Sequence, residues 1–208
     1  MLGGMRGRRG RQGDEPVSLD DAAVALVDAH PTLDAGTVTT LVHHSRDLLA
    51  AIDAGHERLQ QRAVDLAAAR LDALDATVSP GVPRVLFLST RNDGMSILAE
   101  ALVRASGAPV LASSAGVRPV ATVLRSVADA LAEVGVAHPG FPKPLTPEVL
   151  SRADVVVTML CDPPPLHDGQ RTEDWDFEDP AGLGSGAVRT LRDRIRVRVD
   201  ELLAQLGS

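Results

Sequence analysis

Residues 84–107 read RVLFLSTRNDGMSILAEALVRASG. The apolar run at 84–88 predicts a buried strand, and the polar loop at 89–96 leads into a predicted helix over 96–105. At such a strand-to-helix turn, the loop peptides and the helix N-terminus offer backbone N–H groups to an anion. The stretch therefore predicts the start of an α/β domain with a site for a phosphate-like ligand.

The rest of the C-terminal part repeats this alternation. Short apolar strands are predicted at 110–112 and 155–159, and helices at 122–133 and 186–205. Strands that are apolar throughout and are separated by helices indicate a parallel sheet covered on both faces. We expect a doubly wound α/β domain, with ligands bound at the carboxyl ends of its strands.

A different pattern precedes residues 78–83, where prolines and a glycine predict a linker. Residues 16–77 have the apolar spacing of amphipathic helices, with Ser18 and Asp34 as plausible N-caps. Three short helices with brief turns predict a small antiparallel bundle. A homodimer through the apolar faces of this bundle is one hypothesis. The expected helices cover 19–29, 35 to about 54 with Gly55 closing it, and 57–76.

Charge and hydropathy exclude several classes of function. The formal net charge is −7, which argues against nucleic acid as the main partner. The exception is a predicted disordered basic tail at 1–15, interpreted as a solvated start rather than an arm for polyanions. No run approaches the roughly 18 apolar residues that span a bilayer, and no secretory signal is evident, so a cytoplasmic location is expected.

The metal-ligating residues are sparse. Cys161 is the only cysteine in the chain, which excludes a disulfide scaffold and a Cys-rich zinc module. His43, His44 and His56 fall in the predicted bundle without the convergent partners of a metal site, so we interpret them as surface residues. No metal and no cofactor are predicted.

Four segments in the right order resemble the low-molecular-weight protein tyrosine phosphatase and arsenate reductase family. The loop at 89–96 occupies the place of the family's Cys-x5-Arg-Ser loop, and SSAG at 113–116 resembles its SAG turn. ADVVVTM at 153–159 resembles a later strand, and 174–182, with DW and EDPAG, resembles a segment of the arsenate reductase branch. The resemblance covers 84–208. The preceding helices resemble the three-helix domain of some actinobacterial reductases.

The resemblance implies a role for each loop position. Ser89 stands at the position of the nucleophilic cysteine, Met95 at that of the arginine that clamps the oxyanion, and Asp179 at that of the general acid. The remaining residues of the implied anion-binding loop are Thr90, Arg91, Asn92, Asp93, Gly94 and Ser96.

Two of the three implied catalytic groups have lost their chemistry. A thiol with a pKa of about 8.5 becomes a thiolate in a positive loop, whereas the Ser89 hydroxyl needs a neighbouring base. Met95 removes the charged fork of hydrogen-bond donors, and loss of one such donor costs about 10²–10³ in rate. Asp93 adds a negative charge beside the anion, unless Arg91 folds over the loop to compensate.

Three hypotheses follow. The favoured one is a non-catalytic family member that binds a phosphate-like or arsenate-like oxyanion, a phosphoprotein or another partner. The alternative is an active arsenate reductase or protein phosphatase that uses rearranged residues, with Ser89, Cys161, Arg91 and Asp179 as candidates. The third is an interaction module with a closed loop. Cys161 is interpreted as a structural thiol, Trp175 as a packing residue, and Asp179 equally as a turn residue.

Overall fold

The computed structural model describes residues 18–138 and 140–207. The proposed tail at 1–15 lies outside these residues. Three helices come first, α1 (Leu19–Ala29), α2 (Ala35–Asp53) and α3 (Leu59–Leu74), followed by alternating strands and helices. The latter are β1 (Arg84–Ser89), α4 (Met95–Ser106), β2 (Leu111–Gly116), α5 (Arg125–Ala132), α6 (Pro147–Arg152), β3 (Val155–Met159), β4 (Arg171–Asp174) and α7 (Ser185–Leu206).

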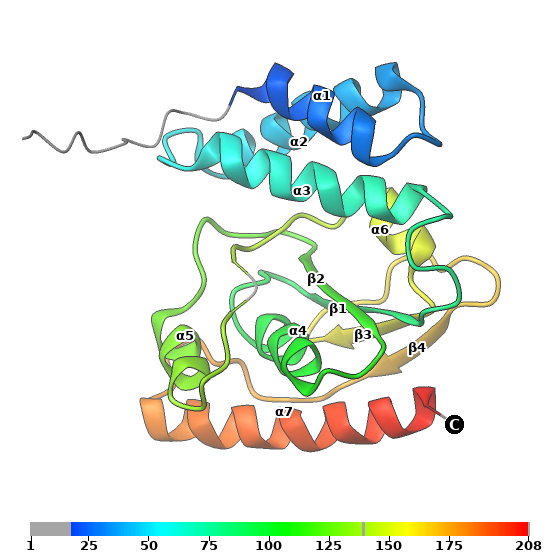
Figure 1. The fold of residues 1–208 in the computed structure, drawn as a ribbon. Helices are drawn as coiled ribbons and strands as arrows, with labels where there is room; N and C mark the ends of the chain where they lie inside the picture. The colour runs from blue at the N-terminus through cyan, green and yellow to red at the C-terminus, as the bar shows by residue number, and fades with distance from the viewer. Residues whose placement is uncertain (1–17, 139, 208) are drawn as a thin grey trace, which may run out of the picture.

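The four strands form one parallel sheet in the order β2-β1-β3-β4. The alternation of side chains along β1 divides its residues between two cores. Val85 and Phe87 pack in the large cluster with α4 and α7, whereas Leu86 and Leu88 pack with α6 on the other face. Figure 1 shows α4, α5 and α7 on one side of the sheet and α6 with the helical layer on the other. The predicted doubly wound fold is confirmed.

Local chemistry places the helix ends. Ser18 Oγ accepts a hydrogen bond from the Asp21 N–H at 3.3 Å, and Asp34 Oδ1 accepts one from the Thr37 N–H at 2.9 Å. Both N-caps therefore lie where the sequence predicts them. Within the described ranges, no helix has both the length and the apolar character needed to cross a bilayer.

Several element bounds differ from the sequence prediction. The third helix covers 59–74 rather than 57–76, α5 covers 125–132 rather than 122–133, and β2 extends to 116. The second strand was predicted too short because its residues after 112 are Ser, Ser, Ala and Gly, which favour strands weakly. Two elements, α6 and β4, were not predicted at all. The first has only six residues, and the second, RTED, is an edge strand without apolar side chains.

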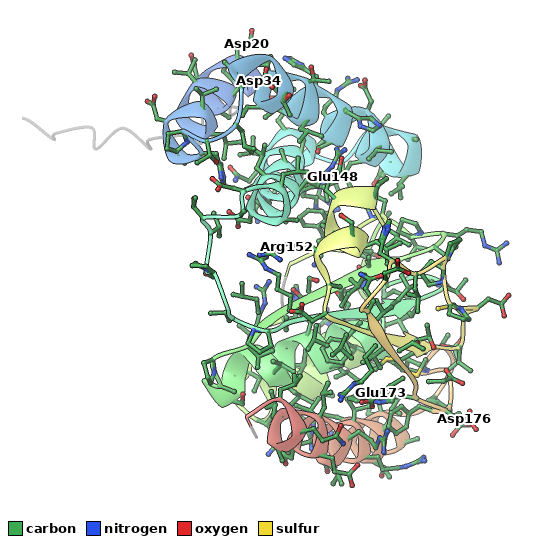
Figure 2. The ribbon with its side chains drawn as sticks, turned by 90° about the vertical axis from the view of Figure 1, so that its right-hand side faces the viewer. Asp20, Asp34, Glu148, Arg152, Glu173 and Asp176 are labelled. Atoms are coloured by element: carbon green, nitrogen blue, oxygen red, sulfur yellow. The ribbon has the colours of Figure 1, made fainter. Side chains whose placement is uncertain are left out.

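The three N-terminal helices, hereafter the helical bundle, sit on the α6 side of the sheet (Figure 1). Phe141, from the connection between α5 and α6, packs among Leu49, Ala63 and Leu66 of α2 and α3. Arg70 on α3 is fully buried and holds Glu148 on α6 through two hydrogen bonds of 3.1 and 2.8 Å. Figure 2 shows Glu148 at the face of α6 that meets the bundle. The bundle therefore completes the cover of this sheet face.

Candidate functional site

The loop from Ser89 to Ser96 joins the end of β1 to the start of α4, and residues 117–124 hold it from outside. The carbonyls of four loop residues accept N–H groups from this segment at 2.8–3.3 Å, namely those of Ser89, Thr90, Arg91 and Asp93. A planar trans peptide points its N–H opposite to its C=O. The N–H groups of the residues that follow each carbonyl therefore point away from the 117–124 segment, as an anion cradle requires.

Asn92 fixes the shape of this cradle. Its φ of 52° lies in the left-handed region, and its N–H donates to Ser89 Oγ at 3.0 Å. Its side-chain amide donates to Ser96 Oγ at 2.9 Å and accepts from the Lys143 N–H at 2.7 Å. Gly116 lets the loop approach this closely, because a Cβ there would meet Asn92 Cβ at 3.0 Å. These contacts fix the shape of the loop.

Ser89 lies at the floor of the loop with its hydroxyl engaged. Its Oγ is 2.8 Å from Ser96 Oγ, and the residue is 6% exposed. It lines a cavity of about 190 Å³ whose ionisable groups are Arg91, Asp93 and Asp179, and no histidine of the described residues lines it. A serine needs an adjacent base to act as a nucleophile. Among the described residues, no histidine lines the cavity to act as a base for the Ser89 hydroxyl.

Met95 takes no part in the electrostatics of the loop. It begins α4, is 4% exposed, and belongs to the large apolar cluster between α4, α7 and the sheet. A thioether in this place supplies packing and offers neither positive charge nor N–H donors. The implied clamp position therefore holds a core side chain that also lines the cavity at the loop.

Two carboxyl groups and one guanidinium set the charge of the cavity. Arg91 Nη2 lies 2.8 Å from Asp93 Oδ2, and Asp93 is buried whereas Arg91 is half exposed. Burial raises the pKa of Asp93, the Arg91 guanidinium opposes that shift, and the Asp179 carboxylate adds to it. The arginine is thus occupied by the loop's own carboxylate, and the pair brings the cradle little net positive charge.

Asp179 and Pro180 line the cavity beside the loop. The Asp179 carboxylate accepts the Ala181 N–H at 2.9 Å, which makes a self-capped turn. Pro180 packs directly on the loop, since a Cβ on Gly94 would lie 2.4 Å from Pro180 Cγ. The glycine at 94 is therefore required for this approach, and Asp179 both lines the cavity and shapes the turn.

Cys161 lies on the opposite face of the sheet from the Ser89 side chain. Its Sγ donates to Leu88 O at 3.5 Å and packs with Leu86 and Leu88, whose side chains alternate with that of Ser89. Burial raises the pKa of the thiol, which opposes a nucleophilic thiolate. The contacts around Cys161 are those of a packing residue.

Trp175 is also placed by packing. It is 2% exposed, with its ring centroid 5.6 Å from that of Phe87, and its Nε1 donates to Glu173 Oε2 at 2.9 Å. The ring forms part of the core beside a second cavity of about 560 Å³. That cavity also holds Arg118 and three aspartates, including Asp176, which Figure 2 shows beyond the end of β4.

Sequence reasoning missed the residues that support the loop from behind. Glu100 on α4 is fully buried and accepts from Ser114 Oγ at 2.5 Å, with Lys143 Nζ at 3.2 Å and Arg104 Nη2 at 2.7 Å. Lys143 is the only lysine of the chain, and its backbone binds Asn92. An acidic residue on the apolar face of a predicted helix was the available signal, since buried charges are almost always paired.

The described residues hold no group of three His, Cys, Asp or Glu side chains arranged for a metal ion. The histidines of the bundle have other neighbours. His43 Nε2 lies 3.3 Å from Asp20 Oδ1, and His44 Nδ1 lies 3.2 Å from Arg70 Nη2. These contacts give His43 and His44 ordinary structural partners.

Comparisons with known proteins agree with this architecture. The family described as low molecular weight phosphotyrosine protein phosphatase matches residues 84–163. A glutaredoxin arsenate reductase from Synechocystis is 30% identical over 136 residues, covering 60% of this chain and 98% of that protein. A thioredoxin-dependent arsenate reductase from Corynebacterium glutamicum superposes with a TM-score of 0.81 at 31% identity, covering 91% of this chain and 96% of that one.

A second solved structure has a serine in its active site. It is a mutant of the arginine phosphatase YwlE described with a phosphorylated active site serine, 26% identical with a TM-score of 0.52, covering 60% of this chain and 96% of that one. The chain belongs to the low-molecular-weight protein tyrosine phosphatase and arsenate reductase family.

Proposed function

We propose that this protein is a non-catalytic member of its family, in which the loop at 89–96 binds an oxyanion or a phosphorylated side chain of a partner protein. One observation carries the proposal. The loop carbonyls around Ser89 are held toward residues 117–124, as an anion cradle requires, while Met95 at the clamp position is buried. A scaffold that keeps its anion-binding backbone and lacks its reactive groups is suited to binding rather than turnover.

The balance of charge supports weak binding. Inward N–H groups and the N-terminus of α4 attract an anion, whereas the buried Asp93 carboxylate repels it. Arg91 Nη2 pairs with Asp93, which reduces this repulsion and leaves the loop little net positive charge. A ligand that brings its own contacts outside the loop, such as a phosphorylated side chain within a protein, adds binding energy that a free anion lacks.

Turnover is opposed by three features. The Ser89 hydroxyl has no histidine beside it among the described residues of the cavity, Met95 supplies no charge, and Cys161 lies on the other sheet face. The phosphorylated serine of the YwlE mutant shows that a serine in the active site of a relative carries a phosphoryl group. A direct search for phosphoserine at Ser89 is therefore part of the test.

The test measures hydrolysis of an aryl phosphate and thiol-coupled reduction of arsenate by the purified chain. We expect no turnover above the buffer rate, and no added phosphoryl mass on the protein after incubation with the aryl phosphate. Turnover that Ser89→Ala abolishes, or a phosphorylated Ser89, would contradict the proposal. Titration with phosphate separates a binding loop, whose amide signals at 90–95 shift, from a closed interaction module, whose signals do not.

A restoration experiment tests whether the scaffold is otherwise intact. The triple variant Ser89→Cys, Met95→Arg and Asp93→Ser returns a thiol, a guanidinium and an uncharged loop. We expect it to gain phosphatase or reductase activity, and we expect the matched variant Ser89→Cys alone to gain far less. A folded triple variant without activity would show that groups needed for catalysis have also been lost outside the loop.

A further inference from the structure

We infer that the helical bundle positions the anion loop, acting through two segments of the α/β domain, residues 117–124 and 141–145. The inference concerns the geometry of the loop and goes beyond the proposed function, since it holds whichever ligand the loop takes. It rests on two chains of contacts that begin on the bundle and end on loop atoms.

The first chain of contacts runs through Arg62. This α3 residue donates from Nη1 to the Ala121 carbonyl at 3.1 Å, and its guanidinium lies 5.1 Å from the centre of the Phe141 ring. Ala121 is in the segment whose N–H groups hold the loop carbonyls. Within it, Arg118 donates to Thr90 O at 2.8 Å. Arg62 of the bundle therefore contacts the same segment that binds the backbone of the loop.

The second chain of contacts runs through Phe141. Its ring is 6% exposed and packs in the bundle core against Leu49 and Leu66. Two residues later, the Lys143 N–H donates to the Asn92 side chain at 2.7 Å, and the Lys143 carbonyl accepts the Gly116 N–H at 2.8 Å. The bundle core is thereby connected to the residue that fixes the loop in its left-handed turn.

The conformation of Asn92 explains why the loop needs such support. A non-glycine residue in the left-handed region is less favourable than ordinary backbone and persists where its surroundings hold it. The Asn92 side chain makes its two bonds to Ser96 and to the 141–145 segment. The second bond lasts only while that segment stays docked, and Phe141 docks it in the bundle.

The bundle itself is fixed by a buried anchor at its other end. Arg70 is 1% exposed and makes bonds with Glu148 on α6 and with Ser45 Oγ at 3.0 Å. Figure 2 shows the bundle and α6 in contact at Glu148. One end of the bundle binds α6 and the other binds Ala121 and Phe141. The bundle thereby holds the segments 117–124 and 141–145 in place beside the sheet.

Hydrogen exchange of the full chain tests this inference without any ligand. Arg62→Ala removes the bond to Ala121 and the contact with Phe141. We expect amides at 90–95 to exchange about three- to ten-fold faster, the range that loss of one net hydrogen bond produces, while amides of β3 keep their rates. The matched control is Arg46→Ala, since Arg46 lies on the exposed face of α2 and pairs only with its neighbour Asp47 in the structure.

Unchanged exchange at 90–95 in Arg62→Ala would overturn the inference, as would an equal change in the control. If Arg62→Ala accelerates exchange throughout the α/β domain, Arg62→Met keeps the packing of the stem and removes only the polar contacts. The loop must then respond more strongly than β3. Because this measurement needs neither phosphate nor turnover, its failure is distinct from a failure of the proposed function.

Discussion

Gly94 and Asp93 are adjacent in the loop, and each illustrates how one side chain changes the site. The absence of a side chain at Gly94 lets Pro180 rest on the loop, whereas the Asp93 carboxylate puts a negative charge where the fold otherwise attracts one. Both effects follow from atoms within a few ångströms, so they can be tested by conservative substitutions.

Gly94→Ala should destabilise the protein. A Cβ would overlap Pro180 Cγ, so either the turn at 179–182 moves or the loop is distorted, at about 1–3 kcal/mol. The free energy of unfolding in denaturant measures the loss. Gly186→Ala on α7 is the control, because its Cβ would meet nothing within 4 Å and alanine favours helices by up to about 1 kcal/mol. Equal stability of the two variants would refute the steric argument.

Asp93→Asn should strengthen anion binding. Removing a charge within roughly 4–6 Å of a bound anion is expected to raise affinity for phosphate on the order of ten-fold at neutral pH, with the gain shrinking in high salt. Calorimetric titration measures it. Asp200→Asn, an exposed substitution on α7, controls for net charge. An affinity that does not change would show that Arg91 already cancels the carboxylate.

At the scale of elements, the end of α3 carries a titratable cap. The Asp75 carboxylate accepts the Thr77 N–H at 2.9 Å and its hydroxyl at 2.6 Å, and these bonds lower the pKa of Asp75 to about 2. The carboxylate is therefore the form that the folded chain prefers. It joins the bundle to the linker that follows.

The pH dependence of this cap has a defined sign. A lowered pKa stabilises the fold above the ordinary value of 3.8, and that stability is lost as pH falls through about 2. Asp75→Asn should therefore be less stable than the parent at pH 7, with the difference vanishing toward pH 2. Thermal denaturation between these limits checks it. A difference that is independent of pH would exclude the carboxylate as its source.

The elements also mark where sequence reasoning succeeded and where it stopped. Strong local signals, such as the apolar run of β3 and the N-cap at Asp34, predicted elements whose bounds agree with the structure. The edge strand β4 is stabilised by pairing with β3, and the residues of β4 alone do not predict that pairing. Likewise, the loop positions were visible in the sequence, but the burial of Met95 and the pairing of Arg91 with Asp93 depend on the folded surroundings.

At the scale of the whole molecule, the bundle and the α/β domain share one interface with a buried ion pair. Arg70 and Glu148 come from segments 78 residues apart, and the arginine side chain is only 2% exposed. The guanidinium lowers the pKa of Glu148 against the effect of burial. Breaking such a pair leaves one charge buried without its partner.

Arg70→Met should cost about 3–5 kcal/mol of unfolding free energy, because Glu148 stays behind in the interface. Arg70→Met with Glu148→Met should cost less than the single variant, since no charge is then stranded. Urea denaturation measures both, with the exposed Arg46→Met as a control that changes stability by less than about 0.5 kcal/mol. A double variant worse than the single one would contradict the electrostatic explanation.

A homodimer through the bundle stays a prediction at this scale. The inner side of α3 is already used by α6, whereas Val24 on α1 is 65% exposed. Light scattering after gel filtration gives the mass in solution. A monomer at micromolar concentration would exclude the dimer, and a dimer that Val24→Glu dissociates would support it.

Lys143, the only lysine of the chain, provides a single amine behind the loop that can be labelled selectively. Lys143 holds Glu100 with a side chain that is 14% exposed, and every other cationic side chain is arginine or histidine. Reagents that acylate amines therefore have one internal target, whose shielding depends on how tightly the bundle and sheet stay closed. The rate at which this amine is labelled therefore reports how often Lys143 becomes exposed to solvent. Mass spectrometry measures that rate without any mutation.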